Sequence, residues 1–149
     1  MVQPKKPLKP RPTNIFVAFL QMFGIMYLRC PIWLRLWLVC LMGTNLIGFT
    51  VLDTIEGQVV VGLMPLIGFP MAYLYQKYGF VKLLGLPHFW WFLLVPWIVL
   101  YRLPLAEDGS FHQKWMQILA ILNSISLVLD VKDVYEYCVL GKTESSFEW

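Results

Sequence analysis

Two carboxylates near the C-terminal end have the residue type and spacing that acid–base chemistry uses. Asp130 and Asp133, followed by Tyr137, stand at positions i, i+3 and i+7, which share one face of a helix. Such a pair could exchange protons or hold a cation. However, they stand where an apolar stretch ends, and charges at that place usually pair with the nearest opposite charge. We therefore predict an ion-pair network there, with cations supplied by other segments: Arg29, Arg35 and Lys82.

His88 is a second candidate, because it lies beside aromatic residues in an apolar stretch. An imidazole there could ligate the iron of a haem or the magnesium of a chlorophyll. Haem ligation by two histidines needs a partner at similar depth, and the only other histidine is His112. By helix rise the two should lie roughly 20 Å apart. We interpret His88 as a helix-packing residue and keep haem or chlorophyll binding, shared with another subunit, as the alternative.

A polar layer is predicted between the first and the last apolar stretch. Asn45 and Asn123 should lie at comparable depth, roughly 10–15 Å from the same membrane surface. Polar side chains in lipid seek hydrogen bonds across helices, each worth about 0.6 kcal/mol. We predict that the first and fourth spans pack through this layer, and a substrate site is the alternative. Its members are Thr44, Asn45, Asn123, Ser124 and Ser126.

The chain carries no recognisable catalytic or metal-binding motif. A P-loop, an HExxH helix, a GxSxG elbow and paired metal-binding cysteines are all missing from the sequence. Asp53 and Glu56 border an apolar stretch, whereas small four-helix exporters place an acidic residue inside the membrane. We therefore expect no enzyme activity and no protein-bound metal, and the sequence requires no cofactor.

The composition explains what must position these residues. Of 149 residues, 58% are hydrophobic and only 14% are charged, against about 25% charged in an ordinary soluble domain. A soluble fold of this size could not bury so much apolar surface, whereas a bilayer can cover it. The sequence therefore predicts an all-α polytopic membrane protein.

Four transmembrane helices are expected within a membrane domain over residues 31–141. Pro65 and Pro70 predict that the second span is kinked or locally broken. The last helix should continue past its apolar stretch and stop at Gly141. The expected spans are 32–52, 57–76, 81–101 and 115–129.

The segments outside the spans predict the orientation. Residues 1–14 form a basic, proline-rich tail, residues 15–30 an amphipathic interfacial helix, and residues 142–149 a polar tail. Most Lys and Arg residues fall on the side of the N-terminal tail, and only Arg102 and Lys114 fall on the other. Positive-inside logic then places both termini in the cytoplasm. Beside a membrane segment, a basic tail is expected to contact anionic lipid and no nucleic acid.

Two stretches, KYGFVKLLGLPHFWWFLLVPWIVLYRL and LNSISLVLDVKDVYEYCVLGK, resemble a group of small uncharacterised bacterial inner-membrane proteins. In that group a similar glycine-containing third span precedes a fourth span that ends in an Asp-Val-x-Asp-Val-x-x-Tyr pattern. Asp130, Val131, Asp133, Val134 and Tyr137 carry this pattern here. The resemblance covers roughly the last three spans. It implies four spans and a bacterial membrane, and it implies no reaction.

These features favour a non-catalytic accessory or assembly subunit of a larger membrane complex, with other membrane subunits and the lipid bilayer as partners. Two other functions stay open. One is a small transporter with a polar path between the first, second and fourth spans. The other is a pigment- or haem-binding subunit that uses His88.

Overall fold

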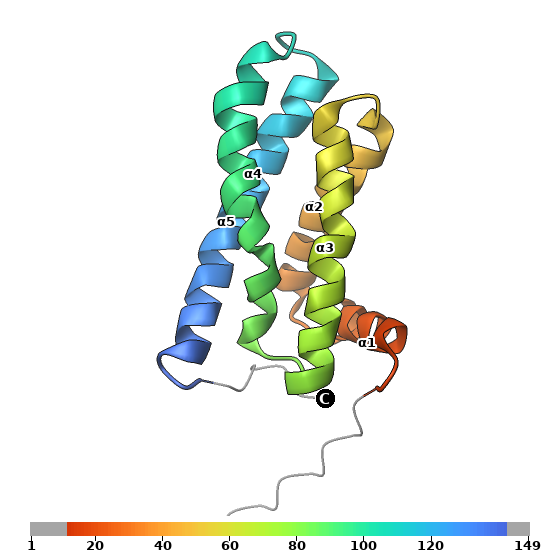
Figure 1. Ribbon diagram of the computed structural model, residues 1–149, viewed down its shortest axis with the longest axis vertical. Helices are drawn as coiled ribbons and strands as arrows, with labels where there is room; N and C mark the ends of the chain where they lie inside the picture. Colours follow the sequence, from red (N-terminus) through yellow and green to blue (C-terminus); the bar gives the residue numbers. More distant parts are fainter. Residues whose placement is uncertain (1–11, 143–149) are drawn as a thin grey trace, which may run out of the picture.

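The computed structural model describes residues 12–142, so most of the predicted basic tail and of the polar C-terminal tail lie outside the described residues. The described chain is helical throughout and contains no strand. Three of its helices are long and apolar enough to cross a membrane, as expected of a membrane protein. They are Ile32–Val51, Ile55–Tyr78 and Lys82–Leu105. Figure 1 shows the long helices side by side, with α1 (Ile15–Leu28) across one end.

The first long helix consists of α2 (Ile32–Leu46) followed directly by the 3-10 helix η1 (Ile47–Val51). A tight turn then leads into α3 (Ile55–Tyr78), where the Thr54 hydroxyl accepts a hydrogen bond from the Gly57 backbone at 3.1 Å. Only glycine fits at position 57, because a Cβ atom there would lie 2.1 Å from the Val51 carbonyl oxygen. We call this end of the molecule, with residues 51–54 and 105–110, the distal end.

The predicted break in the second span is not found, because α3 is one continuous α-helix through Pro65 and Pro70. Both prolines are exposed, so their rings face away from the neighbouring helices. The helix packs on α1, η1 and η2 (Lys82–Trp90), and this packing holds it together where the prolines cannot donate a backbone hydrogen bond. It ends at Gly79, which has a positive φ of 82°, a backbone conformation that favours glycine.

The irregular helix is the third. It begins with η2, continues as α4 (Trp91–Trp97) and the π-helix η3 (Ile98–Arg102), and ends in the short η4 (Leu103–Leu105). Pro87 and Pro96 lie inside it and remove backbone donors, which accounts for the changes of helix type.

The last helix, α5 (Phe111–Cys138), is the longest. The Ser110 hydroxyl caps its start by accepting from the Gln113 backbone at 3.1 Å. The helix ends three residues before Gly141, which has φ of 65° and allows Lys142 N–H to donate to the Glu136 carbonyl at 3.1 Å. α5 is not among the helices that are long and apolar enough to cross a membrane.

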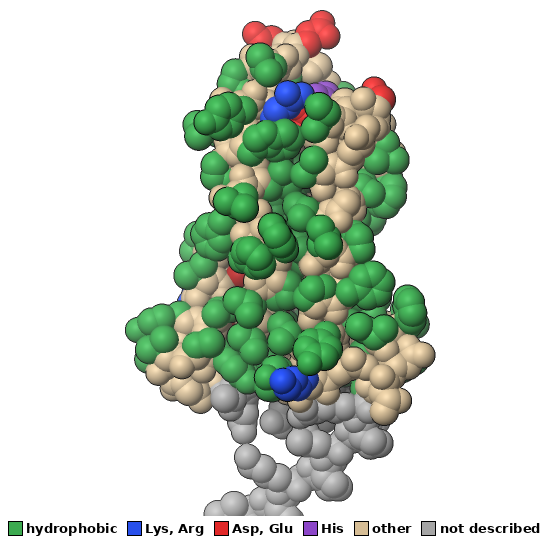
Figure 2. Space-filling view, viewed as in Figure 1, with side chains coloured by type: hydrophobic (Ala, Val, Ile, Leu, Met, Phe, Trp, Pro, Cys, Tyr) green, Lys and Arg blue, Asp and Glu red, His purple; other side chains and the backbone are tan. Residues whose placement is uncertain are grey.

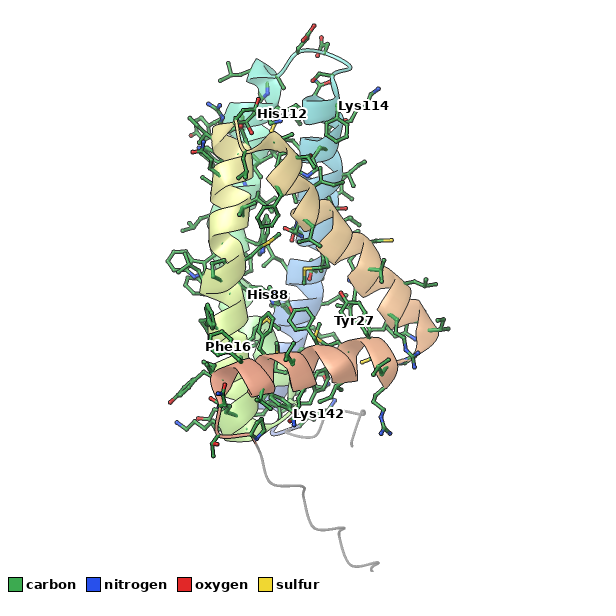
Figure 3. The ribbon with its side chains drawn as sticks, turned by 90° about the vertical axis from the view of Figure 1, so that its right-hand side faces the viewer. Phe16, Tyr27, His88, His112, Lys114 and Lys142 are labelled. Carbon is green, nitrogen blue, oxygen red and sulfur yellow. The ribbon has the colours of Figure 1, made fainter. Side chains whose placement is uncertain are left out.

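The buried core is shared unequally among the helices. Residues from α1, α3, α4 and α5 supply most of the buried apolar side chains, whereas α2 buries only Thr44 and Asn45. In the most apolar stretch of each long helix, the share of buried residues is 11% for the helix Ile32–Val51, 39% for Ile55–Tyr78 and 28% for Lys82–Leu105. Figure 3 shows the reason: α2 leans away from the other long helices towards the end at which α1 lies.

The short helix α1 is apolar around its circumference, and its polar groups are the Gln21 amide and the Tyr27 hydroxyl. One side packs on α3, where Phe19 reaches Gly68 so closely that a Cβ atom there would lie 2.9 Å from the ring. The opposite side exposes Phe16, Val17 and Leu20. An interfacial amphipathic helix normally has a charged face, and α1 differs from that pattern.

Candidate functional site

The ionisable residues gather at two levels of the bundle, and the first is the end at which α1 lies. There Lys82, at the start of η2, forms ion pairs with two residues of α5. Its ammonium group contacts the Glu136 carboxylate directly and lies 3.8 Å from Asp133 Oδ1. Lys142 lies 3.7 Å from the other Glu136 oxygen. Of the predicted network, the structure therefore brings Lys82 and Asp133 together. It adds Glu136, which pairs with both Lys82 and Lys142.

The other predicted members of that network lie elsewhere. Asp130 lies against His88, with 3.3 Å between Asp130 Oδ2 and His88 Nδ1. Arg35 donates to two backbone carbonyls at the end of α1, those of Cys30 and of Leu28, the latter at 2.8 Å. It therefore ties α2 to α1. Arg29 is the residue that caps the C-terminal end of α1. The last carbonyl groups of a helix have no partner within the helix, which explains why Arg35 donates to this end of α1.

The electrostatics differ between the two carboxylates that face Lys82. The hydrogen bond from Lys82 holds the pKa of Glu136 below its ordinary value. Burial raises the pKa of Asp133, and this effect outweighs the attraction of Lys82. Glu136 is therefore the carboxylate whose ionised form Lys82 stabilises most directly.

The predicted polar layer lies between α2 and α5. Asn45 Nδ2 lies 3.5 Å from Asn123 Oδ1, and both side chains are buried. Each amide also donates to a carbonyl one turn earlier in its own helix, so the contact between the helices is long and weak. A stronger link is the indole of Trp115, which donates to the Thr44 carbonyl at 2.9 Å.

The two serines of the predicted layer do not join it. The Ser124 hydroxyl donates to the Ala120 carbonyl at 2.6 Å within α5. Ser126 lies 3.4 Å from Asp130 and therefore belongs with the His88 pair. The side chains of the layer are thus Asn45 and Asn123, with the Trp115 indole as an additional member. Thr44 contributes its backbone carbonyl, because its hydroxyl donates to the Cys40 carbonyl within α2.

The second level of charge is at the distal end, and sequence reasoning missed it. Glu56 is only 3% exposed, and its carboxylate contacts the Arg102 guanidinium directly. The second carboxylate oxygen lies 3.4 Å from His112 Nε2. This triad joins α3, η3 and α5. The available signal was topological, since all three residues fall at the same end of successive spans.

Aromatic rings and a cavity surround this triad. Arg102 lies over the Trp97 ring at 5.7 Å, and the His112 ring lies 5.6 Å from that of Trp115. Beside the triad is an open cavity of about 510 Å³, whose lining includes Asp53, Thr54, Glu107 and Ser110. Figure 3 shows His112 near this end and His88 far down the bundle, so the two imidazoles cannot share one haem.

Apolar side chains separate the two levels. Between Asn123 and His112, α5 buries Met116 and Leu119 completely. Within residues 12–142, no group of three or more His, Cys, Asp or Glu side chains could hold a metal ion. The arrangement can therefore bind helices to one another at three heights.

Comparisons of the whole chain find no matching protein-family model, no matching curated protein and no matching solved structure.

Proposed function

We propose that the chain is a non-catalytic accessory or assembly subunit of a larger membrane protein complex. In this proposal it crosses a bacterial inner membrane four times, with both termini in the cytoplasm. The observation that carries the proposal is the low burial of the helix formed by α2 and η1, which buries the smallest share of its residues among the three long helices.

The four crossings are supported by the course of α5. It runs beside η2 and α4 over much of their length, so its apolar stretch occupies the same height as the third span. Figure 2 shows apolar side chains over the middle of the molecule, and the acidic residues visible at its distal tip. Six Lys and Arg residues described here lie at or near the α1 end, against two towards the distal end, which supports a cytoplasmic α1 end: Arg29, Arg35, Lys77, Lys82, Lys132 and Lys142.

A partner for α2 is supported by the way membrane helices associate. Apolar exposure by itself is no argument, because lipid tails are as apolar as leucine. Membrane helices are instead held by close van der Waals packing and by hydrogen bonds between helices. α2 meets α5 at the Asn45 and Trp115 contacts and α1 through Arg35, and it exposes Ile32, Trp33, Leu36 and Val39 between them. Helices of another subunit would supply the missing packing.

The pairing of the interior polar groups also supports a structural role over transport. Glu56 is paired with Arg102 and His112, and Lys82 with Glu136, whereas the buried Asn45 Oδ1 has no hydrogen-bond partner among the described residues. Groups that satisfy one another across helices hold a bundle together, whereas a transport path needs groups that are free to receive a substrate.

The test is native mass analysis after gentle detergent extraction from the source membrane, with two matched double variants. Leu36→Ala with Val39→Ala trims the exposed face of α2, and Leu93→Ala with Leu100→Ala trims an equally exposed face of the third helix. We expect the wild type and the second variant to be recovered in one larger assembly of fixed stoichiometry, and the first variant to be released. Recovery of all three as monomers would exclude the subunit role and leave transport as the leading function.

A further inference from the structure

The open cavity at the distal end lies where the turn before α3 meets the loop between η4 and α5, since residues of both segments line it. Its volume of about 510 Å³ is within the range of small-molecule sites. All three helices of membrane-spanning length begin or end here, which puts the cavity at the level of the lipid headgroups. Figure 2 shows basic, histidine and acidic side chains together at this end. The cavity therefore offers both signs of charge to a ligand at the membrane surface.

The positive charge of the cavity comes from Arg102, whose guanidinium group is only partly used. Its Nε contacts the Glu56 carboxylate, and the group lies over the Trp97 ring, so the side chain is held in place. Nη1 and Nη2 have no hydrogen-bond partner among the described residues, and the side chain is 29% exposed. These two nitrogens form a fork that matches the oxygens of a phosphate group. Arg102 can therefore bind an anionic group without giving up Glu56.

The negative charge of the cavity comes from Asp53 and Glu107, one in each connecting segment. Both residues line the cavity and are exposed. Neither carboxylate has an ion-pair or hydrogen-bond partner among the described residues. Because Glu56 is compensated by Arg102, these two carboxylates make the cavity negative overall, which opposes a purely anionic ligand. A primary ammonium group suits them, since it carries three hydrogen-bond donors.

We propose that the cavity binds the headgroup of phosphatidylethanolamine, with the phosphate at Arg102 and the ammonium group at Asp53 and Glu107. The lining also includes Ile55 and Leu105, which are exposed and apolar and suit the first acyl carbons of a lipid. The quaternary ammonium group of phosphatidylcholine has no N–H to donate, and phosphatidylglycerol has no positive charge for the carboxylates. The inference concerns binding and is independent of the proposed subunit role.

The experiment is native mass spectrometry of the purified full chain, delipidated in detergent and titrated with phosphatidylethanolamine, phosphatidylcholine and phosphatidylglycerol that carry the same acyl chains. We expect one phosphatidylethanolamine to bind saturably, about fivefold or more tightly than either other lipid. Asp53→Asn with Glu107→Gln should remove the preference over phosphatidylcholine and strengthen the binding of phosphatidylglycerol. Asp108→Asn is the control, because Asp108 is an exposed carboxylate of the same loop that does not line the cavity, and it should leave the preference unchanged.

The phosphate half of the site is tested by Arg102→Lys. A lysine there can keep an ion pair with Glu56, but it has one nitrogen where arginine has three, so no fork is left for a phosphate. The affinity for phosphatidylethanolamine should fall about fivefold to tenfold. An affinity equal to that of the wild type would remove Arg102 from the site.

Three other results contradict the inference. Equal binding of the three lipids by the wild type means that the protein only carries surrounding lipid. A preference for phosphatidylethanolamine that survives the double variant means that the two carboxylates do not hold the ammonium group. Glycerophosphoethanolamine has the same headgroup without acyl chains and should not compete at equal concentration, so competition as strong as that by the lipid would assign the cavity to a soluble zwitterion. Thermal unfolding of each variant shows whether it is folded, and the comparison of lipids on the wild type needs no variant.

Discussion

At the scale of single residues, the least expected feature is a carboxylate almost completely removed from solvent. Glu56 is 3% exposed and depends on Arg102, which is itself 29% exposed. Removing one member of a buried ion pair is costly chiefly because it leaves the other charge without compensation. The cost should therefore depend on which member remains, and the more deeply buried charge should be the worse one to leave.

This asymmetry gives a prediction for the distal triad. Arg102→Met leaves the buried Glu56 carboxylate with His112 alone and should destabilise the protein by about 3–5 kcal/mol. Glu56→Gln leaves Arg102, which can turn towards solvent, and should cost less. The double variant should be more stable than Arg102→Met. Thermal unfolding in detergent tests this order, and an equal loss for both single variants would contradict the burial argument.

The α1 end gives a prediction for pH dependence. The pKa of Glu136 is lowered in the folded protein, so its contribution to stability is present above its ordinary pKa, about 4.3, and is lost as the pH falls below that value. The pKa of Asp133 is raised, so its ionisation opposes folding and its protonation on acidification offsets part of that loss.

We therefore expect Glu136→Gln to flatten the decrease in unfolding temperature between pH 5 and pH 3. Asp133→Asn is the matched control on the same helix face, and it should make the decrease steeper. If Glu136→Gln followed the wild-type curve throughout, the Lys82 contact would contribute nothing to the stability.

Contacts between residues in the interior of the bundle could be predicted from the sequence more readily than contacts at its ends. Asn45 and Asn123 could be paired because helix rise fixes their depth in two apolar stretches. Arg35 could not be placed, because a long side chain at a helix start has a carboxylate and several backbone carbonyls within reach. Glu56 was missed because its burial depends on how three turns fold over it.

At the scale of elements, η2 and α5 share the most extensive contact between two elements of the described residues. Gly85 lies against both the side chain and the backbone of Asp130. A Cβ atom added to Gly85 would lie 3.1 Å from the Cα atom of Asp130. Gly62, in the middle of α3, has nothing within 4 Å of that position. The same Gly→Ala substitution can therefore be compared at a crowded site, Gly85, and at an open site, Gly62.

Gly85→Ala should force the two helices apart and destabilise the protein by about 1–3 kcal/mol. Gly62→Ala should be neutral or slightly stabilising, because alanine is the better helix former by about 1 kcal/mol. Unfolding of both variants in one detergent gives the comparison. A neutral Gly85→Ala would show that η2 can shift along α5 without loss.

Helix type was harder to predict than helix position. The first three expected spans end within about four residues of the observed helices, because the length of each apolar stretch determines them. The same residue type gave opposite outcomes within them: Pro65 and Pro70 face outward in an unbroken α3, whereas Pro87 lies inside a 3-10 helix. Which outcome a proline has depends on its neighbours in space, and these are not encoded in the local pattern.

At the scale of the whole molecule, the cysteines test the proposed orientation. Cys138 is exposed at the end of α5, and Cys40 is exposed in the middle of the α2–η1 helix, at a depth that the bilayer would cover. Cys30 is buried between α1 and α2, and burial raises the pKa of its thiol, which slows its reaction as a thiolate.

A membrane-impermeant maleimide should therefore modify Cys138 in inside-out vesicles and not in right-side-out vesicles, while Cys30 reacts only after unfolding. The variant Cys138→Ser provides the control, since it should remove the labelling. Modification of Cys138 from the right-side-out face would reverse the orientation and place the α1 end outside.

The crosswise position of α1 has a consequence for the membrane itself. Figure 1 shows that the helix widens one end of the molecule only, and its apolar surface, with Phe16, Val17 and Leu20 exposed, suits the acyl region of a single leaflet. A molecule of this outline takes up more area in one leaflet than in the other, so it acts as a wedge. Many copies side by side would make the bilayer convex on the side of α1, because that leaflet holds the larger area. The protein would then concentrate where the membrane is already convex on that side.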